Sequence, residues 1–95
     1  SGLCTPLYLS SAACRLYVIS TLFLTAAFFL NYLGYSWVDR NIRLDEGLKL
    51  IEKAVALRPD DGYILDSLAW AHYRMGHYAQ AVDPMEKAVA AMSSD

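Results

Sequence analysis

A six-residue phrase occurs twice in this chain, at a spacing of 34 residues. Residues 51–56 read IEKAVA and residues 85–90 read MEKAVA. Flanking positions follow the same register, because Leu48 corresponds to Val82 at the same spacing. A fixed period of about 20 to 50 residues predicts units of supersecondary structure that stack against one another. The spacing therefore limits the chain to a repeat architecture.

The correspondence continues upstream, where the spacing becomes 35 residues. Gly34 corresponds to Ala69, and Tyr35 corresponds to Trp70. The first copy therefore carries one extra residue, which must lie within residues 41–44 because the spacing changes there. We expect a turn at this place, since a turn can absorb an insertion more easily than a helix can.

The second copy shows the apolar spacing of two α-helices. Apolar side chains recur at intervals of three and four residues, which predicts a helix over Tyr63–Met75. Asp60 and Asp61 precede this helix, and a carboxylate there can accept hydrogen bonds from the free N–H groups of the first turn. Gly76 ends it, and a second helix is predicted over Tyr78–Met92.

The first copy follows the same plan. Helices are predicted over Asn31–Asn41 and Leu44–Leu57, and Pro59 stops the second of them. The two copies together predict an all-α fold, in which each copy is a hairpin of two antiparallel helices.

These features resemble the tetratricopeptide repeat (TPR) family, whose units are 34-residue helix–turn–helix hairpins. The family's Leu-Gly pair in the first helix is matched by Leu33-Gly34 and, with alanine for glycine, by Leu68-Ala69. Its proline between repeats is matched by Pro59. The stretch RPDDGYILDSLAW is similar to bacterial members of the family.

The second helix of each unit also follows the family's pattern of side-chain sizes. Its small, large and small positions fall on Gly47, Ile51 and Ala54 in the first unit and on Ala81, Met85 and Ala88 in the second. The resemblance implies a TPR-like solenoid fragment of two repeats, over residues 27–61 and 62–95. Residues 1–26 then form a separate apolar segment, which is expected to be helical.

The resemblance further implies a partner-binding groove, because in this family the inner groove is lined by particular positions of each first helix. Those positions fall on Asn31, Tyr35, Val38, Asp66, Trp70, Tyr73 and Arg74. Trp, Tyr and Arg are the residues most often found as binding hot spots. The implied function is a scaffold that binds a protein or peptide partner. Alternatively, Trp70 and Tyr73 pack against a neighbouring hairpin, and the sequence leaves both interpretations open.

The sequence offers little for catalysis, metal binding or nucleic acid. His72 and His77 are the only histidines, and no third ligand type gathers near them. No nucleophile–base arrangement or glycine-rich phosphate loop is found, so we expect no enzyme, catalytic residue, metal or cofactor. Cys4 and Cys14 match no metal-binding or redox spacing and are expected to be structural thiols. The net charge of −2 argues against a nucleic-acid partner.

The apolar N-terminal part has several interpretations. No charged residue occurs from Leu16 to Val38, which satisfies the length of about 20 residues required of a transmembrane helix. Residues 27–38, however, are also needed as the first helix of the first repeat. The segment before them is a helix that caps the repeats, a membrane-associated helix, or a stretch foreign to the repeat. A decayed hairpin and a signal peptide fit less well. The membrane interpretation gives the second functional hypothesis, a membrane-anchored assembly factor, and leaves the location open between cytoplasm and membrane.

Two repeats leave apolar faces uncovered at both ends, whereas about three repeats are usually needed for stability. We expect the N-terminal segment to fold over Leu30 and Leu33 at one end. At the other end, residues 82–92 are expected to contact a second copy of the chain. The sequence therefore predicts a homo-oligomer or an exchange of helices, and a two-fold dimer is the commonest such arrangement.

Overall fold

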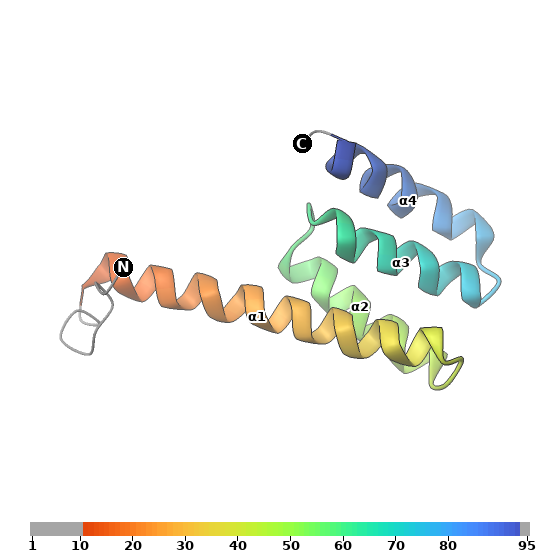
Figure 1. The fold of residues 1–95 in the computed structure, drawn as a ribbon, viewed down its shortest axis with the longest axis horizontal. Helices are drawn as coiled ribbons and strands as arrows, with labels where there is room; N and C mark the ends of the chain where they lie inside the picture. The colour runs from red at the N-terminus through yellow and green to blue at the C-terminus, as the bar shows by residue number, and fades with distance from the viewer. Residues whose placement is uncertain (1–10, 94–95) are drawn as a thin grey trace.

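The computed structural model describes residues 11–93 and contains four α-helices in that part of the chain (Figure 1). They are α1 (Ala12–Asp39), α2 (Leu44–Leu57), α3 (Gly62–Arg74) and α4 (Tyr78–Ser93). Residues 11–93 contain no β-strand, which confirms the all-α prediction. The predicted pairing of α1 with α2 and of α3 with α4 is also confirmed. α3 touches both α1 and α2, whereas α4 touches only α3 among these helices.

The turn between α1 and α2 contains the extra residue of the first copy. Four residues separate α1 from α2, whereas three separate α3 from α4. Asn41 adopts a left-handed conformation with a φ of 59°. The N–H of Ile42 then donates to the carbonyl of Trp37 at 3.0 Å, which satisfies an otherwise free group at the end of α1. The extra residue therefore lies in the turn between α1 and α2, as predicted from the change of spacing.

Gly76 ends α3 by the same mechanism. Its φ of 80° is available to glycine without steric cost. The N–H of His77 donates to the carbonyl of His72 at 2.8 Å, closing the helix end. Tyr78 then begins α4, so that the chain reverses direction within three residues. The predicted stop at Gly76 is confirmed.

Asp61 begins α3. Its carboxylate accepts hydrogen bonds from the backbone N–H groups of Tyr63 at 3.0 Å and Ile64 at 3.2 Å. These groups lack carbonyl partners within the helix, so the side chain replaces the missing acceptors. The predicted cap is confirmed at Asp61. Pro59 lies two residues before Asp61. It directly follows Arg58, the C-cap residue of α2.

The core lies where α3 meets the α1–α2 hairpin. One buried cluster contains Ala27, Ala54 and Ile64, and a second contains Val38, Ile51 and Ala71. Each cluster takes one residue from each of α1, α2 and α3. The core therefore fixes the second hairpin on the first.

Pro84 lies inside α4 and does not end it. A proline within a helix removes one N–H donor and crowds the carbonyl four residues earlier, here that of Gln80. α4 nevertheless runs without interruption from Tyr78 to Ser93. The helix predicted over Tyr78–Met92 therefore forms in spite of Pro84.

The first half of α1 extends away from the other three helices (Figure 1). α1 continues without a break through residues 26 and 27, the boundary placed between the N-terminal segment and the first repeat. The large apolar side chains before this point are mostly exposed, among them Leu16, Leu22 and Phe23. The expectation that this segment folds over Leu30 and Leu33 is wrong, because the segment continues the axis of the helix that carries them.

α1 is long and apolar enough to cross a membrane, as judged by its length and composition alone. Cys14, near its start, is disulfide-bonded, so the expectation of a structural thiol is wrong there. Cys4 lies outside the described residues. Thr21 donates its hydroxyl to the carbonyl of Tyr17 at 3.0 Å, which satisfies that polar group within the helix.

Candidate partner-binding surfaces

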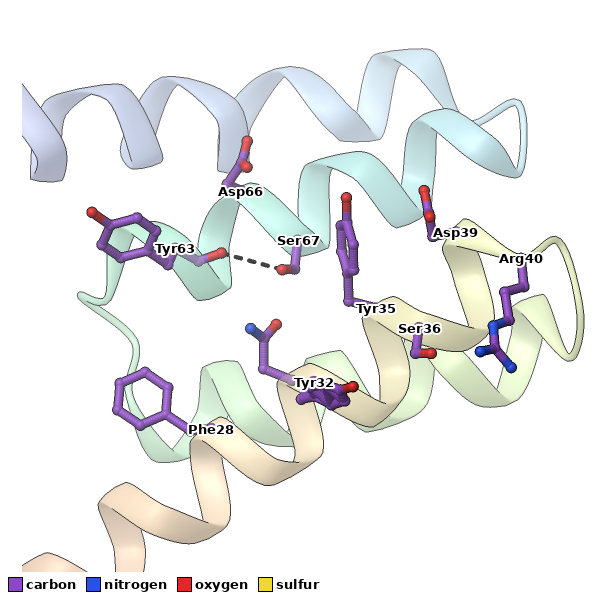
Figure 2. Close-up of a pocket in the computed structure, with 10 residues that line it drawn as sticks. Phe28, Tyr32, Tyr35, Ser36, Asp39, Arg40, Tyr63, Asp66 and Ser67 are labelled. Carbon is purple, nitrogen blue, oxygen red and sulfur yellow. Dashed lines mark hydrogen bonds between the residues drawn. The ribbon is translucent and has the colours of Figure 1, made fainter.

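A groove of about 620 Å³ runs between α1 and α3 (Figure 2). It is lined by Phe28, Asn31, Tyr32, Tyr35, Ser36, Asp39, Arg40, Tyr63, Asp66 and Ser67. Residues three, four and seven apart share one face of a helix, and for this reason α1 contributes a continuous stripe from position 28 to position 39. Three of the predicted site residues, Asn31, Tyr35 and Asp66, come together here.

Tyr35 stands in the middle of the groove between α1 and α3 (Figure 2), and the residue is 40% exposed. Phe28 and Tyr63 lie toward one end of the groove, and Asp39 lies toward the other (Figure 2). A ligand along this groove would therefore meet aromatic rings first and a carboxylate last. Asp66 adds a second exposed carboxylate from α3.

The polar groups of the groove differ in how far they are already paired. The hydroxyl of Ser67 donates to the carbonyl of Tyr63 at 3.2 Å, so this group is used within α3. The side-chain oxygen of Asn31 is buried and has no hydrogen-bond partner within the described part of the chain. A buried acceptor without a donor costs free energy. Asn31 is thus the groove residue whose side-chain acceptor is left unsatisfied.

Val38 is not a groove residue. Its side chain is completely buried, with 0% exposure, and packs with Ile51 of α2 and Ala71 of α3. α1 is contacted on two sides by α2 and α3, and Val38 lies on the part of its surface that both of them cover. The implied role of Val38 in partner binding is therefore wrong, and this residue belongs to the core.

Trp70 and Tyr73 line a second, separate surface of about 640 Å³ between α3 and α4. Its other lining residues are Ala69, Tyr78, Ala81, Val82, Met85 and Glu86. The rings of Trp70 and Tyr73 stack with centroids 5.7 Å apart and an interplanar angle of 15°. Glu86 is the only charged residue among those that line this surface, which is otherwise strongly apolar.

Arg74 lies between the two surfaces. Its guanidinium donates to the backbone carbonyl of Asp39 at 3.3 Å, at the end of the groove. The same guanidinium lies 5.6 Å from the ring centroid of Trp70, within reach of a cation–π interaction. Six of the seven predicted residues are therefore divided among the groove, the α3–α4 surface and the core, and Arg74 lies between the two surfaces.

Several groove residues were not predicted. Phe28, Tyr32, Ser36 and Asp39 recur at intervals of three and four residues on α1, as do Asn31 and Tyr35. The spacing of these residues can be read from the sequence. The stripe was nevertheless not predicted, because the whole segment is apolar and this face does not stand out from the others. Tyr63, one residue after the start of α3, is exposed and closes the groove from the other side.

The two histidines face each other across the α3–α4 turn. Their Nδ1 atoms are 3.5 Å apart, a distance at which one ring can donate to the other. Burial lowers the pKa of His72, and the nearby His77 lowers it further, whereas Glu52 opposes the shift. The described residues contain no group of three or more His, Cys, Asp or Glu side chains that could hold a metal ion. The pair is best explained as part of the turn.

Two antiparallel hairpins, repeated at 34 to 35 residues and stacked through small buried side chains, define a TPR-like helical fragment. The chain is similar to the TPR repeat-containing protein PA4667 of Pseudomonas aeruginosa, with 52% identity over 52 residues. The matched part is 55% of this chain but only 9% of that protein. The resemblance to bacterial TPR proteins is thus confirmed for part of the chain. No family model matches the chain, and no solved structure matches it.

Proposed function

We propose that this chain is a protein-interaction scaffold that binds an extended peptide segment of a partner in the groove between α1 and α3. The observation that supports the proposal is the composition of that groove, in which exposed aromatic rings alternate along α1 with polar side chains. Tyrosine rings offer a large contact area at a small cost in conformational entropy, and this explains their frequency at binding sites. The TPR-like fold and the repeat-containing relative support the same class of function.

The groove favours a peptide with a basic side chain. Asp39 and Asp66 contribute two carboxylates, and Arg40 is the only cationic residue that lines the groove. A lysine or arginine placed beside Tyr35 could pair with a carboxylate and stack on the ring. We expect the side-chain oxygen of Asn31, which is buried without a partner, to turn toward the peptide and accept from one of its backbone N–H groups, which lose their water on binding.

The test is selection of peptides from a random display library against the folded chain, followed by measurement of dissociation constants. Tyr35→Ala is expected to weaken binding about 30-fold, which corresponds to the ~2 kcal/mol of an interface hot spot. Tyr17→Ala is the matched control, because Tyr17 is exposed on α1 outside the groove and should leave affinity unchanged. Failure to select any peptide, or equal effects of the two substitutions, would refute the proposal.

A second function, attachment to a membrane as an anchored assembly factor, is favoured by the exposed apolar half of α1. Leu16, Leu22 and Phe23 are each more than half exposed, and no charged residue occurs from Leu16 to Val38. Large apolar side chains exposed over several turns of a helix indicate contact with an apolar partner or a lipid surface.

Flotation with phosphatidylcholine vesicles tests this function. The chain is expected to float with the vesicles, and Leu22→Asp is expected to return most of it to solution, because a charged side chain is costly in the apolar part of a bilayer. Ala79→Asp adds the same charge at an exposed site on α4 and should not change flotation. A chain that stays in solution with and without vesicles would exclude membrane attachment and leave the groove proposal intact.

A further inference from the structure

The structure contains one interface between repeats, and its geometry is specific. α3 lies against both helices of the first hairpin, α1 and α2. Ile64 of α3 packs with Ala27 and Ala54, and Ala71 of α3 packs with Val38 and Ile51. The first hairpin thus acts as a receptor surface, and one face of α3 acts as the helix that docks on it.

The receptor surface recurs at the other end of the molecule, where the described residues do not cover it. By the register of the repeat, Val38 corresponds to Tyr73, Leu48 to Val82, Ile51 to Met85 and Val55 to Val89. These four counterparts on α3 and α4 are exposed, and Val82 is 56% exposed. They overlap the apolar surface that Trp70 and Tyr73 line. The second hairpin therefore exposes an apolar surface that corresponds to the receptor surface of the first hairpin, on which α3 docks.

The docking face also recurs, on the outer side of α1. Ile64, Leu68 and Ala71 of α3 correspond to Phe29, Leu33 and Ser36 of α1. Phe29 is 65% exposed, and Leu33 is partly exposed. Leu33 is identical to its counterpart, and Ser36 differs from alanine by a single hydroxyl group. The chain therefore has a docking face at one end and the matching receptor surface at the other.

We propose that a second copy of this chain docks its α1 between α3 and α4, in the register in which α3 docks between α1 and α2. The occupant is argued from the interface inside the molecule, because each free end repeats one half of that interface. Electrostatics does not oppose the contact, since Glu86 is the only charged residue on the receptor surface and Phe29, Leu33 and Ser36 are uncharged. Removal of these apolar faces from water favours the contact.

This arrangement differs from the two-fold dimer expected from the sequence. In a two-fold dimer both copies use the same surface, whereas here one copy uses α1 and the other uses α3 and α4. Such a head-to-tail contact leaves one free end of each kind after every addition, so the assembly grows into short chains of copies. The receptor surface on α3 and α4 shares no lining residue with the α1–α3 groove, whereas Ser36 of the docking face also lines that groove. The inference goes beyond the proposed function.

Two substitutions test the inference by blocking one end each. Phe29→Asp removes the docking face, and Val82→Asp removes the receptor surface, while each leaves the other end intact. Both side chains are exposed, so the fold should be preserved, and this is checked by far-UV circular dichroism. Ala79→Asp is the control, because it adds the same charge on α4 at a position that corresponds to the exposed Asp45.

Sedimentation velocity at increasing concentration gives the readout. The wild-type chain and the Ala79→Asp variant should form a series of species that exceed a dimer. Each blocked variant alone should be a monomer, and an equimolar mixture of the two should form a dimer and nothing larger. This restored dimer is the decisive result, because non-specific association through residues 12–26 would not produce it.

Other outcomes overturn the inference. A Phe29→Asp variant that still dimerises, together with a monomeric Val82→Asp variant, would indicate a two-fold contact between α4 helices. Association that neither substitution changes would place the contact elsewhere on the molecule. A wild-type chain that remains monomeric over the whole concentration range would show that no contact between copies forms.

Discussion

Replacing Ile64 with alanine is expected to lower the free energy of unfolding by about 2–5 kcal/mol, the range for removing a large aliphatic side chain from a packed core. Ile64 is completely buried and packs with Ala27 of α1 and Ala54 of α2. The two alanine side chains cannot extend into the space left behind, and the larger neighbours Leu30, Val55 and Leu57 would relax only partially, so part of the cavity would persist. The loss is a large fraction of the ~5–15 kcal/mol that stabilises a small domain.

The measurement is the urea midpoint, followed by far-UV circular dichroism. Ile64→Val provides a graded variant, which should cost only about 0.5–1.5 kcal/mol. Ile19→Ala is the matched control, because the same side chain is removed from a site that is 48% exposed, and the change should stay within about 0.5 kcal/mol. Equal midpoints for Ile64→Ala and Ile19→Ala would contradict the packing of α3 on the first hairpin.

The repeat register predicted much of this fold because the sequence signals are local. Asp61 caps α3 and Gly76 ends it, as their positions beside the apolar periodicity indicate. The single extra residue was located by the change of spacing within residues 41–44. The helical nature of the N-terminal segment was predicted, but its direction was not, although no glycine or proline occurs from Ala12 to Leu33 to end a helix there. Continuity of α1 follows from that absence, and the segment therefore extends outward instead of folding back.

The candidate site was predicted only in part. Contacts between helices decide which of the predicted residues line the groove, which line the α3–α4 surface and which are buried in the core. Tyr35 and Val38 are three residues apart on α1, yet Tyr35 faces the groove and Val38 is buried. A small rotation of α1 about its axis would exchange their environments, and the sequence period does not fix that rotation. Trp70 and Tyr73 lie on the end face of the second hairpin. Their role depends on what covers that face, which lies outside the repeat itself.

The second large effect is expected from Gly34→Ala, because α1 and α2 cross in close contact at this position. A Cβ atom on Gly34 would lie 2.7 Å from the carbonyl oxygen of Gly47 and 2.8 Å from Cγ1 of Ile51. A backbone carbonyl within a helix cannot move by itself, so the two helices must separate. Overpacking of this kind costs about 1–3 kcal/mol. Alanine returns about 0.5–1 kcal/mol through its helix propensity, and this gain is smaller than the expected loss.

Gly62→Ala is the matched control for this substitution. A Cβ atom on Gly62 would lie 2.9 Å from Cγ of Met92, a flexible side chain that can move aside. The nearest backbone atom, the carbonyl oxygen of Ala88, would be 3.2 Å from this Cβ, farther than the 2.7 Å at Gly34. The same chemical change should therefore destabilise the fold less at Gly62 than at Gly34 in urea unfolding. A Gly34→Ala variant as stable as Gly62→Ala, or more stable than the wild type, would contradict the close crossing.

The combined variant Gly34→Ala/Gly47→Ala gives a stricter test of the close contact between α1 and α2. A Cβ atom on Gly47 would lie 2.9 Å from the carbonyl oxygen of Gly34, so each glycine makes room for the backbone of the other. Once the first alanine has pushed α1 and α2 apart, the second meets less resistance, and the combined loss should be smaller than the sum of the two single losses. The second hairpin has Ala69 and Ala81 at the corresponding positions, so methyl groups already stand at its helix crossing. Strict additivity of the two glycine substitutions would show that they do not share one crossing.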